Sequence, residues 1–206
     1  MNLPARFWIL ILFLWSTAWT VEAQTPSVGP KDLCLSGQPS APIRVDVFSD
    51  FQCPSCRGFY LETIKPLIKD YGKENKVCVR YFDFPLKMHK FAFEASRYSV
   101  AARRLGQDPW QKVCEALYEH QAKWTEDGKI EAAVADVLSA EEMSRLKKIL
   151  KEPSIDQMIN QELALATERQ VTMTPTLFLL VNGREKKVNG KISYPILKEY
   201  LERMSK

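Results

Sequence analysis

The chain has 206 residues, of which 46% are hydrophobic, and its formal net charge is +4. This length suits one domain, or one domain with an insertion, and the hydrophobic content is enough for a sizeable core. Basic and acidic residues are interspersed along the chain, which excludes the concentrated basic surface of a nucleic-acid-binding protein.

Residues 1–23 have the pattern of a secretory signal peptide. Arg6 provides the positive start, Phe7–Trp15 is an apolar core, and small residues favour cleavage after Ala23. The apolar core is shorter than the roughly 20 residues of a bilayer span, although an uncleaved anchor is the alternative. We therefore expect an exported, periplasmic protein with residues 24–206 as the mature chain.

The mature chain begins with a predicted strand–helix–strand unit. A short edge strand is expected at 31–36. Residues 43–48 alternate apolar and polar side chains, as a strand does, and 57–65 have a helical pattern. A second strand covers 76–84. Such a unit places its two strands parallel in one sheet.

Helices dominate the next segment, at about 87–169. Ser139 with Glu142, and Ser154 with Gln157, have the spacing of capping boxes at helix starts. The segment is too long for a simple crossover, so we interpret it as an inserted helical subdomain.

The chain closes with a predicted hairpin and helix. An apolar strand at 176–181 is followed by Asn182-Gly183, a strong two-residue hairpin signal, and by a return strand at 184–188. An amphipathic helix at 194–204 ends the domain.

Cys53 and Cys56 lie where the first strand passes into its helix. The start of a helix offers unpaired N–H groups and the positive end of the dipole, which favour a thiolate at Cys53. We therefore predict Cys53 as the exposed nucleophile of a redox-active disulfide and Cys56 as the buried resolving thiol. Pro54 and Ser55, between them, would tune the redox potential.

Two other interpretations of this cysteine pair remain open. The pair could form a disulfide that never exchanges, or half of a zinc site. A zinc site needs further ligands at suitable spacing, and the two histidines, His89 and His120, are far apart in sequence. We therefore expect no metal.

Thr174-Pro175 precedes the apolar strand of the hairpin. X-Pro bonds are the main place where cis peptides occur, and a cis bond would present backbone groups beside Cys53. An extended substrate could then pair with this loop as an added strand. Taken alone, the motif also fits an ordinary trans proline at a strand start.

The combination of a strand ending in FSDFQCPSC (48–56), a helical insertion, MTPT (173–176), a hairpin and a closing helix resembles the DsbA-like branch of the thioredoxin superfamily. The resemblance covers about 42–204. It implies an α/β, thioredoxin-like fold with an inserted helical subdomain. It also places the nucleophile at Cys53, the resolving cysteine at Cys56 and the cis-proline at Pro175, with no cofactor beyond the cysteine pair.

The resemblance further implies dithiol–disulfide exchange with unfolded or reduced exported proteins. Such a monomeric oxidase is reset by a membrane thiol-redox partner. Two departures, Ser55 in the dipeptide and Thr174 before the proline, leave a disulfide isomerase or reductase as alternatives. A binding or chaperone module with a purely structural disulfide is the alternative from another class.

Two polar residues lie near the cysteine pair in sequence or in the expected fold. Asp50, three residues before Cys53, is a candidate proton relay, although a solvated loop carboxylate is the simpler interpretation. His89 follows the second strand and is expected as a surface histidine at a helix start.

The sequence also contains aromatic residues with a core pattern and three cysteines outside the Cys53–Cys56 pair. Four aromatic residues are expected in the core rather than in a peptide-binding groove: Phe91, Phe93, Tyr98 and Trp110. A second disulfide among Cys34, Cys78 and Cys114 is possible. In the expected strand order Cys34 and Cys78 approach each other, but the sequence leaves the pairing open.

Overall fold

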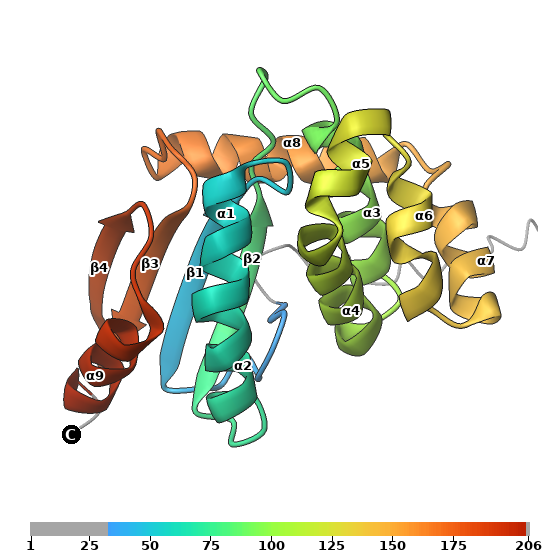
Figure 1. Cartoon of the computed structure of the whole chain (residues 1–206). Helices are drawn as coiled ribbons and strands as arrows, with labels where there is room; N and C mark the ends of the chain where they lie inside the picture. Colours follow the sequence, from blue (N-terminus) through green and yellow to red (C-terminus); the bar gives the residue numbers. More distant parts are fainter. Residues whose placement is uncertain (1–32, 205–206) are drawn as a thin grey trace, which may run out of the picture.

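A four-stranded sheet forms the centre of the computed structural model, which describes residues 33–204 (Figure 1). The strand order is β2-β1-β3-β4. β1 runs parallel to β2 and antiparallel to β3, and β4 is antiparallel to β3. The bounds are β1 (Ile43–Ser49), β2 (Val77–Asp83), β3 (Thr176–Val181) and β4 (Arg184–Asn189).

One helical run joins β1 to β2 and lies in front of them in Figure 1. It consists of α1 (Pro54–Phe59), the π-helical turn η2 (Tyr60–Ile64) and α2 (Lys65–Tyr71). Pro66 cannot donate a backbone hydrogen bond, and the preceding turn widens so that the Lys65 N–H reaches the Tyr60 carbonyl. The proline therefore alters the helix without ending it.

The side chains of β1 are buried on both faces of the sheet. Val45 and Val47 belong to the core beneath α1. Phe48, on the opposite face, stacks on Phe82 with ring centroids 4.8 Å apart, in a cluster that includes Ala166 of α8 (Ser154–Glu168). The polar Asp46 is buried within this strand as well, where its carboxylate is paired with Arg80 and Arg169.

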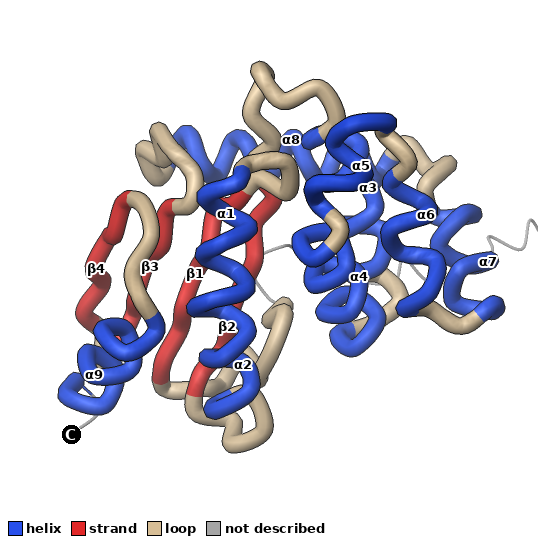
Figure 2. Tube along the Cα trace, in the orientation of Figure 1, coloured by secondary structure: helices blue, strands red, loops and turns tan. Residues whose placement is uncertain are grey.

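Helices occupy the chain between β2 and β3; in Figure 2 most of them gather beside the sheet, whereas α8 runs behind its upper end. They are α3 (Ala92–Arg103), α4 (Gln107–Glu119), α5 (Gln121–Asp127), α6 (Ile130–Val134), the 3-10 turn η3 (Ala135–Val137), α7 (Ala140–Ile149) and α8. Among the described residues, no helix has both the length and the apolar character needed to cross a membrane.

One of the two expected capping boxes is present. Ser139 and Glu142 exchange side-chain and backbone hydrogen bonds at the start of α7. The prediction for Ser154 was wrong, because the N-cap of α8 is Pro153 and Ser154 already lies in the helix. Its hydroxyl donates instead to Glu152, at 3.3 Å.

The four aromatic residues expected in the core lie there with one exception. Trp110 and Tyr98 are buried, and Phe91 packs against the core from a partly buried position. Phe93 is 38% exposed, so the expectation that it is buried was wrong. It lies on the outward side of α3, one residue after the buried Ala92.

A disulfide between Cys34 and Cys78 ties the beginning of the described chain to β2. The Cα atoms of the two residues are 5.5 Å apart. Instead of the expected edge strand, a single bridge joins Ser36 to Val79. The expected signal peptide at 1–23 lies outside the described residues.

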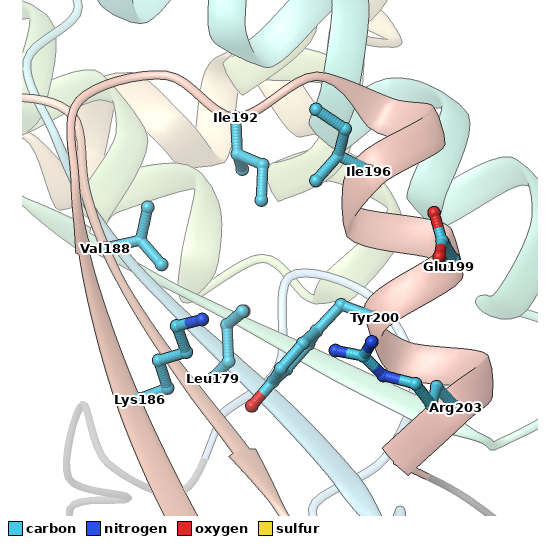
Figure 3. A pocket seen from close by; sticks show the side chains of 8 residues that line it. All are labelled: Leu179, Lys186, Val188, Ile192, Ile196, Glu199, Tyr200 and Arg203. Carbon is cyan, nitrogen blue, oxygen red and sulfur yellow. The ribbon is translucent and has the colours of Figure 1, made fainter.

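The closing helix α9 (Tyr194–Met204) packs over the hairpin on the same face as α2. A groove of about 200 Å³ separates α9 from the hairpin. Figure 3 shows the side chains that line this groove. Leu179 and Val188 come from the strands and Ile192 from the connecting loop. The charged residues around them are Lys186 of β4 and Glu199 and Arg203 of α9.

Candidate active site

Cys53 lies four residues after the end of β1, where the chain enters α1. It has extended backbone angles, φ −75° and ψ 121°, and serves as the N-cap of α1. Its carbonyl accepts a hydrogen bond from the Arg57 N–H at 3.1 Å, and Pro54 is the first helical residue. Proline suits this position because the N–H that it lacks would have no partner in the helix.

The loop before β3 lies directly beside this turn. The Thr174–Pro175 peptide bond is cis, not the trans bond that the motif taken alone also allows. The Cys53 Sγ lies 4.0 Å from the Thr174 carbonyl oxygen. The loop is held to the hairpin by the Gly190 N–H, which donates to the Pro175 carbonyl at 2.8 Å.

Cys53 and Cys56 have opposite acid–base properties. The pKa of Cys53 is lowered from 9.0 to about 5, mainly by a hydrogen bond with the Cys56 side chain and also by the backbone amides of Cys56 and Ser55. Burial raises the pKa of the Cys56 thiol well above its ordinary value. Cys53 is partly exposed and Cys56 is fully buried, so the sulfur that solvent can reach is also the more acidic one.

Asp50 lies wholly inside the protein, so the expectation of a solvated loop carboxylate was wrong. Its Oδ1 accepts the Gln52 N–H at 2.7 Å, and its Oδ2 accepts the Leu86 N–H at 2.8 Å. His89 Nδ1 is also 2.8 Å from Oδ2. His89 is therefore not a free surface histidine: with Asp50 it joins the cysteine turn to the loop after β2.

The helical insertion also contacts the cysteine turn. The side-chain amide of Gln121, in α5, donates to the carbonyls of Phe51 at 2.6 Å and Cys53 at 3.1 Å. Arg57 Nε donates to the Tyr118 carbonyl at 3.0 Å. Nothing near Gln121 and Tyr118 in sequence marks them as site residues, and only the folded chain brings them to the cysteine turn.

The third free cysteine is remote from solvent. Cys114 is buried in α4, where burial raises the pKa of its thiol. Its neighbour is the Ser99 hydroxyl, at 3.7 Å. Within residues 33–204, no group of three or more His, Cys, Asp or Glu side chains is arranged to hold a metal ion.

Comparison with known proteins agrees with this geometry. A family model described as thioredoxin matches residues 31–203. A probable disulfide bond formation protein D of Bacillus anthracis is 23% identical over 163 residues, which are 77% of this chain and 70% of that protein. Its counterpart in Bacillus cereus is 24% identical over the same length, covering 77% of this chain and 71% of that protein.

Solved structures share the fold. The thiol-disulfide exchange protein alpha-DsbA2 of Wolbachia pipientis is 21% identical with a TM-score of 0.68, covering 82% of this chain and 86% of its own. Oxidised BdbD of Bacillus subtilis is 21% identical with a TM-score of 0.67, covering 82% and 91%.

The mixed sheet, the Cys-X-X-Cys turn and the neighbouring proline loop define a thioredoxin-like protein. The chain belongs to the thioredoxin family. It is a thiol:disulfide oxidoreductase that is similar to the DsbA-type proteins named above.

Proposed function

We propose that this protein is an exported dithiol oxidase that passes its Cys53–Cys56 disulfide to reduced or unfolded exported proteins. The observation that carries the proposal is the contrast within the pair: Cys53 is accessible with a pKa of about 5, whereas Cys56 is buried. A thiolate stabilised in the reduced protein makes the corresponding disulfide a stronger oxidant.

The reaction uses the pair as nucleophile and resolving thiol. A substrate thiolate attacks the Cys53 sulfur, the Cys53–Cys56 bond breaks, and Cys56 leaves with the electron pair. A second substrate thiolate then attacks the substrate sulfur of the mixed disulfide and releases Cys53 as a thiolate. The substrate is oxidised by two electrons, and no metal or organic cofactor enters the cycle.

The loop at Thr174 and Pro175 is proposed to hold the substrate. The Thr174 carbonyl lies beside the Cys53 sulfur, so an extended peptide that pairs with the loop backbone would lie next to that sulfur. Pro54 and Ser55 are proposed to tune the potential, because the Ser55 amide is one of the groups that lower the Cys53 pKa. Asp50 remains a candidate for moving a proton near the pair.

Export and a membrane partner complete the proposal. The Cys34–Cys78 disulfide supports an oxidising compartment, because such bonds rarely persist in the cytosol. We propose that residues 1–23 are removed on export, that residues 24–206 form a single thioredoxin-like domain with its insertion near 87–169, and that a membrane thiol-redox protein reoxidises the pair.

The test is transfer of the disulfide to a reduced peptide that carries two cysteines. The purified, oxidised protein should convert one equivalent of peptide dithiol to disulfide and become reduced itself, followed by mass spectrometry of alkylated samples. The Cys53→Ala variant should transfer nothing. A wild-type protein that leaves the peptide reduced contradicts the proposed function.

A further inference from the structure

Cys56 presents a physical difficulty for the proposed function. Its sulfur must carry a negative charge when it leaves Cys53 and again when it attacks a mixed disulfide in the reverse direction. The side chain is completely buried, and burial raises the pKa of its thiol. An anion at this position needs hydrogen-bond donors, because a buried charge without partners is strongly destabilised.

A chain of three buried hydroxyl groups lies next to Cys56. The Ser49 Oγ is 2.8 Å from the Tyr118 hydroxyl, which in turn hydrogen-bonds the Tyr81 hydroxyl. The Ser49 side chain lies within hydrogen-bonding reach of Cys56, and both it and the Asp50 backbone favour the Cys56 thiolate. All three hydroxyl residues are buried, so water does not compete for these bonds.

Three different elements bring the hydroxyl groups together. Ser49 is the last residue of β1, and Tyr81 belongs to the neighbouring β2, where it pairs with Val47. Tyr118 comes from α4, in the helical insertion. The Arg57–Tyr118 hydrogen bond holds α4 against α1, the helix that carries Cys56.

The two phenols remain hydrogen-bond donors throughout the cycle. Burial raises the pKa of both Tyr81 and Tyr118, and the charge of Cys56 raises each further. The nearby Asp50 carboxylate already accepts from two backbone amides and contacts His89. The neutral hydroxyl chain is therefore the side-chain source of hydrogen bonds for the Cys56 sulfur.

We propose that the Ser49 hydroxyl donates a hydrogen bond to the Cys56 thiolate, with Tyr118 and Tyr81 as positioning residues that orient this hydroxyl. This inference rests on the proposed function. When a substrate thiolate attacks Cys53, the Cys53–Cys56 bond breaks and the electron pair moves to Cys56, where Ser49 stabilises it. Of the two protons lost by the substrate dithiol, one ends on Cys56 and the other enters solvent, while Cys53 remains a thiolate.

The reverse step offers a direct measurement. The protein is prepared with glutathione disulfide-linked to Cys53, and the release of glutathione by Cys56 is followed over a range of pH. Ser49→Ala should slow release about tenfold, the effect of losing one hydrogen bond to a charged group. Ser49→Thr, which keeps the hydroxyl, should restore most of the rate, and Tyr118→Phe should slow release by a smaller factor.

Two controls separate this role from a structural one. Tyr60→Phe removes a phenol hydroxyl from a ring that stacks on Tyr118 at 4.8 Å, whereas the Tyr118 hydroxyl bonds Ser49 and Tyr81. This variant should release glutathione at the wild-type rate. The alkylation rate of Cys53 should be the same in every variant, because the donors act on the other sulfur.

Equal release rates for wild type, Ser49→Ala and Tyr118→Phe would overturn the inference, and so would equal slowing by Ser49→Ala and Tyr60→Phe. Either result leaves the proposed function standing as long as the wild type exchanges. If Ser49→Ala does not fold, the inference is tested by the other two variants: Tyr118→Phe should still slow glutathione release, and Ser49→Thr should release it at close to the wild-type rate. A wild-type protein that does not form or resolve the glutathione adduct contradicts the proposed function itself.

Discussion

The Cys53 sulfur lies 4.0 Å from the carbonyl oxygen of Thr174, a residue 121 positions later in the chain. The strand pairing makes this contact possible, because β3 runs antiparallel to β1 and pairs Phe48 with Thr176. The cysteine at the end of one strand therefore meets the loop that starts the next. A substrate peptide bound to this loop would have its own cysteine placed beside Cys53.

The two cysteines should behave differently when each is replaced. Cys53→Ala should abolish exchange, because the accessible thiolate is lost. Cys56→Ala has no disulfide to donate, but its Cys53 thiolate should attack the disulfide form of the peptide, release one peptide thiolate and stay linked to the other sulfur, visible as a mass increase that reductant reverses. The matched control is Cys114→Ala, which removes a buried free thiol of α4 and should keep wild-type exchange. A stable adduct on Cys56 in the Cys53→Ala variant would contradict the assigned order.

The acidity of Cys53 can be read from thiolate absorbance near 240 nm in the reduced protein. We expect a titration at about pH 5, against an ordinary value of 9.0. Cys53→Ala should lose this titration, since the pKa values of Cys56 and Cys114 are both raised. A titration near pH 9 alone would show that the turn does not stabilise the Cys53 thiolate.

The same pKa shift predicts how stability depends on pH. Because the folded-state pKa of Cys53 is lower than its unfolded value, the thiolate stabilises the reduced protein above about pH 9. This stabilisation should decline as the pH falls from about 9 to about 5 and then level off. The oxidised protein has no such titration, and Cys56 stays protonated in both folded and unfolded states below about pH 9, so below that pH the difference in free energy of unfolding between the reduced and oxidised forms isolates Cys53. A difference that is constant across this window would contradict the prediction.

Asp50 should be important for stability as well as for the shape of the site. Asp50→Ala leaves the N–H groups of Gln52 and Leu86 without their acceptor inside the protein, which should lower the free energy of unfolding by about 2–4 kcal/mol. Asp127→Ala is the matched control, because Asp127 accepts the Lys129 N–H on the surface and should have little effect. Denaturant titration measures both, and equal effects would show that burial of Asp50 is unimportant.

The Cys34–Cys78 disulfide should be structural. Its loop spans 44 residues, so replacing both cysteines by alanine should lower the free energy of unfolding by about 4 kcal/mol. Exchange by Cys53 and Cys56 should be retained, because Cys34 and Cys78 bridge the beginning of the described chain to β2. Denaturant titration of the oxidised proteins gives the first quantity and peptide oxidation gives the second. Loss of exchange with an intact fold would give this bond a redox role.

The sequence predicted those features that depend on local patterns. The strand–helix position of Cys53 and Cys56 and the hairpin at Asn182-Gly183 follow from periodicity and turn residues. Asp50 was misread because its position in a loop suggests solvent, whereas its amide partners come from a distant segment. The Ser154 capping box failed because Pro153, which also suits a helix start, takes the cap position.

Sequence patterns do not predict the contacts that the helical insertion makes with the cysteine turn. Gln121 and Tyr118 lie in ordinary helical sequence, and their bonds to the cysteine turn depend on how α4 and α5 pack against α1. The pairing of Cys34 with Cys78 likewise required the Cα distance. Sequence patterns predict the helices and strands that carry the site residues. They do not predict how these elements pack against one another, and that packing completes the site.

The redox potential of the Cys53–Cys56 pair tests the central claim most directly. It is measured by equilibrating the protein with glutathione buffers and counting free thiols after alkylation. With Cys53 at a pKa of about 5, we predict a value less negative than about −180 mV, in the range of protein disulfide isomerase or more oxidising. A value near −270 mV, about that of thioredoxin, would contradict the oxidase and identify a reductant.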